Sequence, residues 1–168
     1  FSPCGNSAIV AFGNRVFITS NTGKTFRPLQ WANAPVVKVA FCKSEPPFAV
    51  IKCQDGSCFM LEVTDKTNAP SKITHPENKK IVHIAECCDF NGYYLYDGAD
   101  IFVCPWGGKA TKAKLALSKP ISHMISLVGG LVFIAEDLYV YSNKECKKVF
   151  TGLSDNYVDF CFDTDAAF

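Results

Sequence analysis

The chain has 168 residues, of which 48% are hydrophobic and 13% aromatic, a composition typical of a folded globular protein. Its 17 Lys and Arg residues against 16 Asp and Glu give a net charge of +1, so charge offers no basis for binding nucleic acid or an anionic membrane surface. No apolar run approaches the roughly 18 residues that a membrane-spanning helix requires. These properties predict one domain with a substantial core.

The first patterned stretch contains three expected strands. Ser7–Phe12 (SAIVAF) and Arg15–Ile18 are rich in residues that favour strands, and Gly13-Asn14 between them has the chemistry of a tight turn. A second turn at Asn21–Lys24 leads into a further strand at Thr25–Leu29. The sequence therefore predicts an antiparallel meander at the start of the chain.

The same arrangement recurs at a spacing of roughly 40 residues, the period of repeat architectures with four short strands per unit. An aromatic residue anchors the third strand of each unit, at Phe17, Phe59, Phe102 and Tyr139. The expected first strands contain Val37–Val39, Val82–Ile84, Ser122–Met124 and Val158–Phe160. The expected second strands are Ser7–Phe12, Phe48–Cys53, Tyr93–Tyr96 and Leu131–Ala135. The expected fourth strands are Thr25–Leu29, Ser71–Ile73, Lys114–Leu117 and Lys147–Phe150.

Short antiparallel meanders at this spacing predict an all-β fold, a β-propeller or partial propeller with about four blades' worth of strands. The repeats are expected at residues 1–34, 35–78, 79–118 and 119–154, with the start of a further repeat at 155–168. Phe1 opens in mid-motif and Asp163–Phe168 read as another second strand. We therefore expect this chain to be an excerpt of a longer propeller protein.

Apolar residues of the first, second and third strands are expected to form the core. Its expected members are Ile9, Val10, Phe17, Val39, Val50, Phe59, Leu61, Ile84, Leu95, Phe102, Val103, Phe133, Tyr139 and Phe160.

The nine cysteines are odd in number, irregularly spaced and contain no CxxC motif, which argues against a zinc site and against a fully paired disulfide set. They predict a reducing compartment, either cytoplasm or nucleus. Cys53 and Cys58 flank the Asp55-Gly56 turn and could face each other across a hairpin. A disulfide there would need an oxidising compartment, so a secreted location is the alternative.

The sequence contains few candidate catalytic or metal-binding residues. His83 and His123 occupy the same position in successive repeats and could bind zinc or act in catalysis, or they could simply lie on the polar face of an inner strand. A nucleophile pair of Cys87 or Cys88 with His83 lacks a recognisable carboxylate partner, so a buried or half-buried thiol is the expectation. His75 in the loop before Pro76 is expected to be solvated. We therefore predict no enzyme activity, no cofactor, no metal and no small-molecule substrate.

Trp31 and Trp106 are the candidate partner-binding residues. Both lie at expected strand ends or loops, and exposed aromatic side chains commonly anchor protein interfaces. The alternative is that both rings pack between the edges of neighbouring blades. The expected partners are proteins, or the remaining blades of the same propeller.

Two segments carry a family resemblance. Phe1-Ser2-Pro3-Cys4-Gly5, followed by Thr22-Gly23-Lys24, resembles the turns of a WD repeat. This resemblance implies a β-propeller that acts as a non-enzymatic protein–protein interaction scaffold.

Two further resemblances imply alternatives. Val36–Ala40 followed by FAVIKCQDGSCFML, and Ile81–Ala85 followed by Tyr93–Val103, are similar to blades of the regulator-of-chromosome-condensation-like propellers. That family implies nucleotide exchange or chromatin binding. Thr19–Phe26 resembles a single Asp-box with Asn21 in place of Asp, which implies a secreted, ligand-binding propeller.

Overall fold

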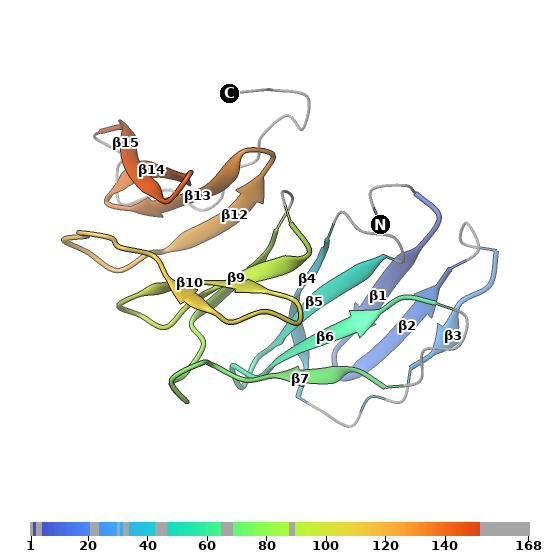
Figure 1. Cartoon of the computed structure of the whole chain (residues 1–168). Coiled ribbons are helices and arrows are strands. Elements are labelled where there is room, and N and C mark those ends of the chain that lie inside the picture. The colour runs from blue at the N-terminus through green and yellow to red at the C-terminus, as the bar shows by residue number, and fades with distance from the viewer. Residues whose placement is uncertain are drawn as a thin grey trace. The chain divides into compact units, whose positions relative to one another are not determined.

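A computed structural model of the chain describes residues 2, 5–20, 24–29, 31, 34–42, 47–64, 69–87 and 90–151. Throughout these residues all regular secondary structure is β-strand (Figure 1). Among them no helix is long and apolar enough to cross a membrane. The chain divides into two compact units, residues 1–81 and residues 82–168.

The first unit contains two antiparallel sheets whose strands follow one another in chain order. Sheet 1 consists of β1 (Ala8–Phe12), β2 (Arg15–Thr19) and β3 (Arg27–Pro28). Sheet 2 consists of β4 (Val36–Phe41), β5 (Phe48–Cys53), β6 (Cys58–Glu62) and β7 (Ser71–Ile73).

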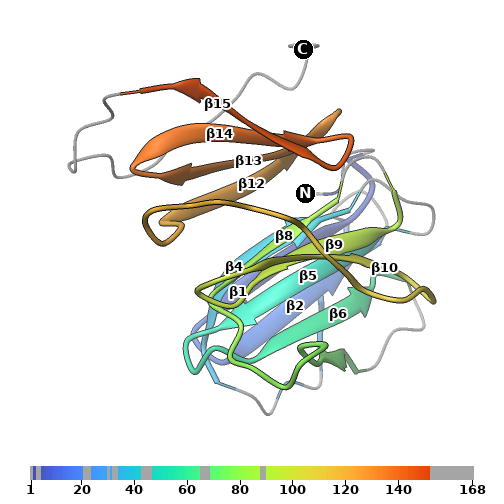
Figure 2. The same cartoon turned by 60° about the vertical axis from the view of Figure 1, so that its left-hand side comes forward.

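The second unit repeats this organisation. Sheet 3 consists of β8 (His83–Glu86), β9 (Gly92–Tyr96), β10 (Ile101–Pro105) and β11 (Thr111–Lys112). Sheet 4 consists of β12 (His123–Leu127), β13 (Gly130–Ala135), β14 (Asp137–Ser142) and β15 (Glu145–Phe150), which lie side by side in that order (Figure 2).

The turns predicted at Gly13-Asn14 and Asp55-Gly56 are confirmed, whereas most of the turn predicted at Asn21–Lys24 lies outside the described residues. Gly13, with a φ of 58°, closes the β1–β2 hairpin, in which Phe12 pairs with Arg15. In the β5–β6 hairpin Gly56 has a φ of 85°, a conformation that glycine adopts at little cost. The Asp55 carboxylate there accepts hydrogen bonds from the Ser57 hydroxyl at 2.6 Å and the Ser57 amide at 2.9 Å.

Each sheet has two faces because successive side chains of a strand point to opposite sides. We call the face that carries the aromatic anchor of the third strand the rear face, and the opposite one the front face. The anchors are Phe17, Phe59, Phe102 and Tyr139.

Within each unit, a front face packs on a rear face. In the first unit, Val16 and Ile18 of sheet 1 share a buried cluster with Ile51 and Phe59 of sheet 2. In the second unit, the front face of sheet 3 meets the rear face of sheet 4 in the same way. The buried members of that second cluster are Ala85, Cys87, Tyr94, Tyr96, Ile101, Ala113, Ile121, Met124, Leu131, Phe133, Ala135 and Tyr141.

Seven of the predicted core residues are buried, and they are Val50, Phe59, Leu61, Ile84, Leu95, Phe102 and Phe133. Five others are half-buried, namely Ile9, Phe17, Val39, Val103 and Tyr139. The prediction for Val10 was wrong, because its side chain is 49% exposed. Val10 pairs with Phe17 on the rear face of sheet 1, whereas the buried cluster of the first unit includes Val16 and Ile18 on the opposite face. Phe160 lies outside the described residues.

The fourth strand predicted at Lys114–Leu117 was also wrong. The pairing with β10 ends early, at Thr111–Lys112, with one further hydrogen bond from the Ala113 amide to the Ile101 carbonyl at 2.8 Å. Leu115 and Leu117 instead pack against the core of the second unit from a non-strand segment. Their alternating apolar pattern therefore reflects packing of a connection and not a strand of the sheet.

Cys53 and Cys58 are both free thiols and do not face each other. Cys58 pairs with Lys52 across the hairpin, which places these two side chains on one face of sheet 2. Cys53 follows Lys52 directly in β5 and therefore points to the opposite face. The disulfide considered from the sequence is excluded by this register.

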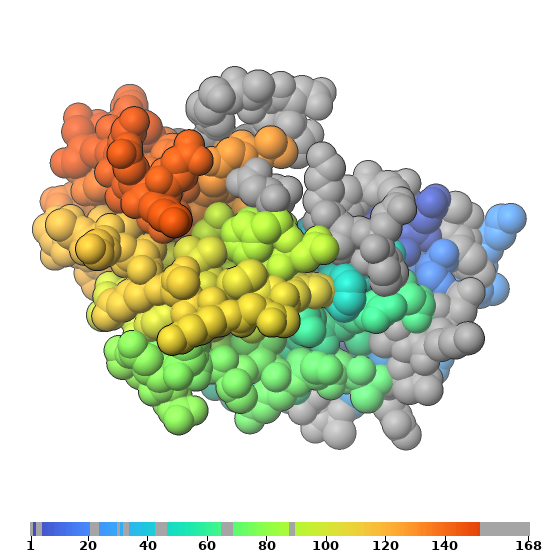
Figure 3. Space-filling view, viewed as in Figure 1, coloured from blue at the N-terminus to red at the C-terminus, as the bar shows by residue number. Residues whose placement is uncertain are grey.

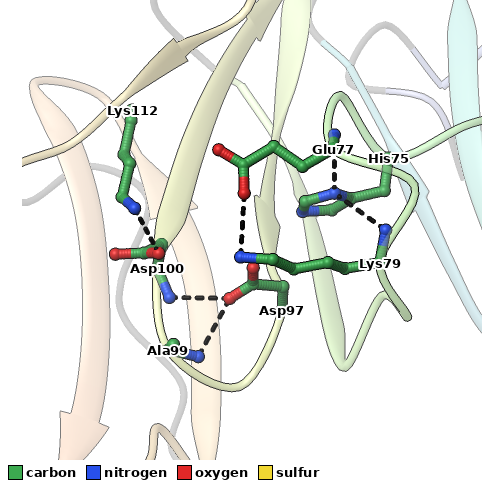
Figure 4. A network of polar contacts seen from close by, with 7 residues as sticks. All are labelled: His75, Glu77, Lys79, Asp97, Ala99, Asp100 and Lys112. Carbon is green, nitrogen blue, oxygen red and sulfur yellow. Dashed lines mark hydrogen bonds and ion pairs between the residues drawn. The ribbon is translucent and has the colours of Figure 1, made fainter.

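His75 is buried at 5% exposure, so the expectation of a solvated side chain was wrong. Its Nδ1 accepts hydrogen bonds from the amides of Glu77 at 3.0 Å and Lys79 at 3.3 Å, and so organises the turn after β7 (Figure 4). The side chains of Glu77 and Lys79 form an ion pair at 2.8 Å.

In the second unit a carboxylate accepts backbone hydrogen bonds within the β9–β10 turn. Asp97 Oδ1 accepts hydrogen bonds from the amides of Ala99 and Asp100 (Figure 4). The side chain of Asp100 in turn pairs with Lys112 of β11 at 2.5 Å.

Candidate functional site

Trp31 lies in the first unit and is half-buried. Its ring meets Phe59 edge-on, with centroids 5.1 Å apart and planes inclined by 67°. Its Nε1 donates a hydrogen bond to the Ala34 carbonyl at 3.3 Å. Trp31 thus packs against the core of the first unit, and a role in partner binding stays a prediction.

Trp106 follows β10 directly and is also half-buried. Its amide donates a hydrogen bond to the Asn91 carbonyl at 2.9 Å, which joins this turn to the start of β9. The partner-binding role of Trp106 likewise stays a prediction. Neither tryptophan lines the groove or the cleft described below.

The two histidines of the repeated column have separate surroundings. His83 Nε2 lies 3.1 Å from the Ile121 carbonyl, and its ring stacks on Tyr96. His123 Nδ1 lies 3.2 Å from the hydroxyl of Ser122. Within the described part of the chain no three His, Cys, Asp or Glu residues are grouped so that they could hold a metal ion.

The front face of sheet 4 is the first candidate interaction surface. The strand registers place Val132 opposite Val140 and Ile134 opposite Leu138 on this face. In sheet 3 the matching position to Val140 is Val103, which packs against sheet 4. The front face of sheet 4 therefore carries aliphatic side chains at the positions that sheet 3 uses for sheet-to-sheet packing.

A groove of about 290 Å³ runs over this front face. Its floor is aliphatic, and its edge on β15 includes the ion pair between Lys147 and Glu145 at 3.6 Å. Val149 beside it is 52% exposed, and β14 and β15, coloured red, lie open to the surface in Figure 3. We call this surface the front groove.

A second hollow lies inside the second unit, between the front face of sheet 3 and the rear face of sheet 4. This cleft has a volume of about 460 Å³. Sheet 3 and its connections contribute Phe90, Tyr94, Val103 and Thr111, and sheet 4 with its turns contributes Gly129, Gly130, Tyr141, Ser142, Asn143 and Lys144.

Several thiols in the described part of the chain have a raised pKa. Burial raises the pKa of Cys58 to about 11 and that of Cys104 to about 12. Burial also raises the pKa of Cys146. A raised pKa keeps these side chains as thiols at neutral pH, whereas a reactive cysteine needs its thiolate form.

Sequence reasoning missed both the front groove and the cleft. The paired glycines Gly129-Gly130 were the available signal for the cleft, because they mark a rim without side chains. The Ser142–Glu145 turn was not singled out, although Ser142 and Asn143 line both hollows.

No family model and no curated protein matches the sequence. Solved structures do match. The chain superposes on human WBSCR16 with a TM-score of 0.59 and 10% identity over 82% of this chain and 45% of that one. PorZ, a bacterial surface component of the type-IX secretion system of Porphyromonas gingivalis, matches with a TM-score of 0.58 and 14% identity over 86% of this chain and 20% of that one.

A third similar structure is BBS1N in complex with ARL6DN, with a TM-score of 0.59 and 14% identity over 89% of this chain and 52% of that one. The chain thus spans between 20% and 52% of the length of these three structures. Together with the four antiparallel sheets, these likenesses identify the fold as a β-propeller or partial propeller.

Proposed function

We propose that this chain is a non-enzymatic protein–protein interaction scaffold and forms part of a larger propeller protein or complex. The observation that carries the proposal is the front face of sheet 4. This face carries aliphatic residues and a groove. The equivalent face of sheet 3 packs against a neighbouring sheet. The proposed occupant is the rear face of a further antiparallel sheet, because rear faces are what front faces contact within both units.

The rear face of sheet 1 supports the same proposal from the other end of the repeat series. Val10 is 49% exposed and Phe12 is 80% exposed on this face. Exposed apolar groups gathered on one face commonly mark an interaction site. The front face of sheet 4 and the rear face of sheet 1 are therefore of the two kinds that pack together within each unit.

The comparisons favour a binding role of this kind. BBS1N, which this chain resembles in fold, was solved in complex with ARL6DN. We further propose that the repeats are WD-repeat-like. Most of the residues that carry that resemblance, including Thr22 and Gly23, lie outside the described part of the chain.

We also propose an intracellular location, cytoplasmic or nuclear. The six described cysteines are all free thiols. Five of them are buried, which favours a structural role as small apolar side chains and suits a reducing compartment.

Sedimentation of the full chain with two single variants tests this proposal. Val149→Lys places a charge beside the front groove, and Phe12→Lys places one on the rear face of sheet 1. A front-to-rear contact between two copies is heterologous, which means that it joins two different surfaces. Each variant therefore loses one of these two surfaces and keeps the other. We expect wild type to associate at low micromolar concentration and each variant to associate less.

Mixing the two variants provides the sharper result. Val149→Lys retains an intact rear face and Phe12→Lys an intact front face, so an equimolar mixture should form a discrete one-to-one complex. A stable wild-type monomer, or a mixture that shows no complex, would contradict the proposed front-to-rear packing. Lys24→Glu, on an exposed residue outside both faces, serves as the control and should associate like wild type.

A further inference from the structure

The cleft between sheets 3 and 4 has the walls of a binding site for a large apolar side chain. Tyr94 and Tyr141 are 4% and 8% exposed and form part of its walls. Phe90 meets Tyr94 edge-on with ring centroids 5.7 Å apart. The Tyr94 hydroxyl accepts a hydrogen bond from the Cys87 thiol at 3.7 Å. Tyr94 also lines the cleft, where its ring is available for apolar contact. Its volume of about 460 Å³ lies in the range of ligand pockets.

One rim of the cleft is a backbone surface. A Cβ added to Gly130 would lie 2.4 Å from the Tyr141 carbonyl oxygen, so the two strands approach there as only glycine allows. A Cβ added to Gly129 would meet no atom within 4 Å. The rim at Gly129 is therefore open, and another backbone can approach it closely.

The same end of sheet 4 also carries a positive charge, because the β14–β15 turn lies beside the β12–β13 turn. Asn143 and Lys144 form the two-residue turn between β14 and β15, with φ values of 51° and 66°. Positive φ at both central residues is typical of a two-residue hairpin turn, so these two residues form a tight end to the hairpin. Lys144 is the one charged residue among the described residues that line the cleft, and within the described part of the chain no carboxylate pairs with it.

We propose that this cleft binds an extended peptide in which an aromatic side chain is followed by carboxylate side chains. The aromatic ring enters between Phe90, Tyr94 and Tyr141, the peptide backbone passes the Gly129 rim, and a carboxylate pairs with Lys144. The cleft shares Ser142 and Asn143 with the front groove but lies on the other face of sheet 4. The inference rests on the proposed function only in treating the chain as a binder of proteins.

Fluorescence anisotropy with labelled octapeptides tests the inference. The probe peptide carries Phe-Asp-Asp within Gly and Ser residues, and two matched peptides carry Phe-Lys-Lys and Ala-Asp-Asp. We expect the full chain to bind the Phe-Asp-Asp peptide at least about tenfold more tightly than either matched peptide, a difference of about 1.4 kcal/mol. Added salt should weaken this binding, because the carboxylate contact lies at an exposed rim.

Two variants locate the site. Lys144→Glu reverses the rim charge, and Thr111→Trp fills the cleft from an exposed position of β11. Each should weaken binding at least about tenfold, while Lys24→Glu, an equal charge reversal in the other unit, should change it less than about twofold. Near-UV circular dichroism checks that the variants keep the wild-type fold.

Three results would overturn the inference: no binding of the Phe-Asp-Asp peptide up to about 1 mM, equal binding of the three peptides, or wild-type binding by both folded variants. A Kd of 1 mM corresponds to a binding free energy of about −4 kcal/mol. Val149 and Phe12, which test the front-to-rear packing, do not line the cleft. Failure of this inference and failure of the proposed function are therefore separate outcomes.

Discussion

The rings of Phe133 and Tyr139 stack on the rear face of sheet 4, with centroids 5.4 Å apart and planes inclined by only 8°. The two residues are direct partners across β13 and β14. Phe133 is fully buried, whereas Tyr139 is half-buried and lies 5.8 Å from the ammonium of Lys148. The stacked pair thus extends from the core of the second unit to its surface.

Phe133→Ala should lower the free energy of unfolding by about 3–5 kcal/mol, as truncation of a buried aromatic side chain does. Phe12→Ala is the matched control, because Phe12 is 80% exposed and its truncation should change stability by less than about 0.5 kcal/mol. Urea unfolding followed by circular dichroism measures both values. Equal costs for the two variants would contradict the assignment of Phe133 to the core.

The hairpins could be predicted because their signals are local. Asp55-Gly56 between two apolar runs leaves few alternatives to a tight turn, and the β5 bounds Phe48–Cys53 agree with the expected strand. The aromatic anchors likewise fall in β2, β6, β10 and β14, where third strands were expected. What the pattern could not show is which faces are covered, and for this reason Val10 was wrongly placed in the core.

Neither hollow could be predicted, since each depends on groups far apart in sequence. The cleft joins Phe90 and Thr111 of one sheet with Lys144 of the next, and no single stretch contains the pattern. Trp31 was predicted to bind a partner because it is an aromatic residue at a strand end or loop, yet its ring packs on Phe59. Composition and spacing do not distinguish an exposed ring from one that a neighbouring sheet covers.

Gly130→Ala should destabilise the second unit by roughly 1–3 kcal/mol, because the added Cβ would lie 2.4 Å from the Tyr141 carbonyl oxygen and must displace backbone. Gly129→Ala is the control. Its Cβ meets no atom within 4 Å, so the cost is limited to the strain of its φ of +97°, about 1–2 kcal/mol. Thermal and urea unfolding compare the two, and a smaller loss for Gly130→Ala than for Gly129→Ala would contradict the close approach of β13 and β14.

Asp55 should contribute to stability only above acidic pH. The hydroxyl and then the amide of Ser57 lower the pKa of its carboxyl below the ordinary value. A lowered pKa in the folded state gives stability that is fully present above the unfolded pKa of about 3.9 and is lost as pH falls through the lower folded pKa. Asp55→Ala should therefore be less stable than wild type at pH 7, and the difference should shrink below about pH 4.

The control for this effect is Ser57→Ala, which removes the hydroxyl donor and leaves the amide donor. Its pH-dependent difference from wild type should have the same sign as that of Asp55→Ala and a smaller size. Urea unfolding from pH 7 to pH 3 provides the measurement. A difference between wild type and Asp55→Ala that stays constant over this range would show that Asp55 does not act through its charge.

The thiols should react slowly in the folded protein and completely after unfolding. Burial raises the pKa of Cys58 to about 11 and that of Cys104 to about 12, so few of these groups are thiolates at pH 8. Cys146 is half-buried and should react before them. Because Cys4, Cys88 and Cys161 lie outside the described residues, the kinetic test uses a variant with serine at those three positions.

In that variant a chromogenic disulfide reagent at pH 8 should label Cys146 first and Cys58 and Cys104 much later, while all six remaining thiols react at once in guanidinium. Cys146→Ser should remove the fastest phase and leave the slow ones unchanged. Rapid native labelling of Cys58 would contradict its burial in the β5–β6 hairpin. In the unmodified chain, unfolding without reductant should release nine thiols, whereas eight paired cysteines would contradict the proposed reducing compartment.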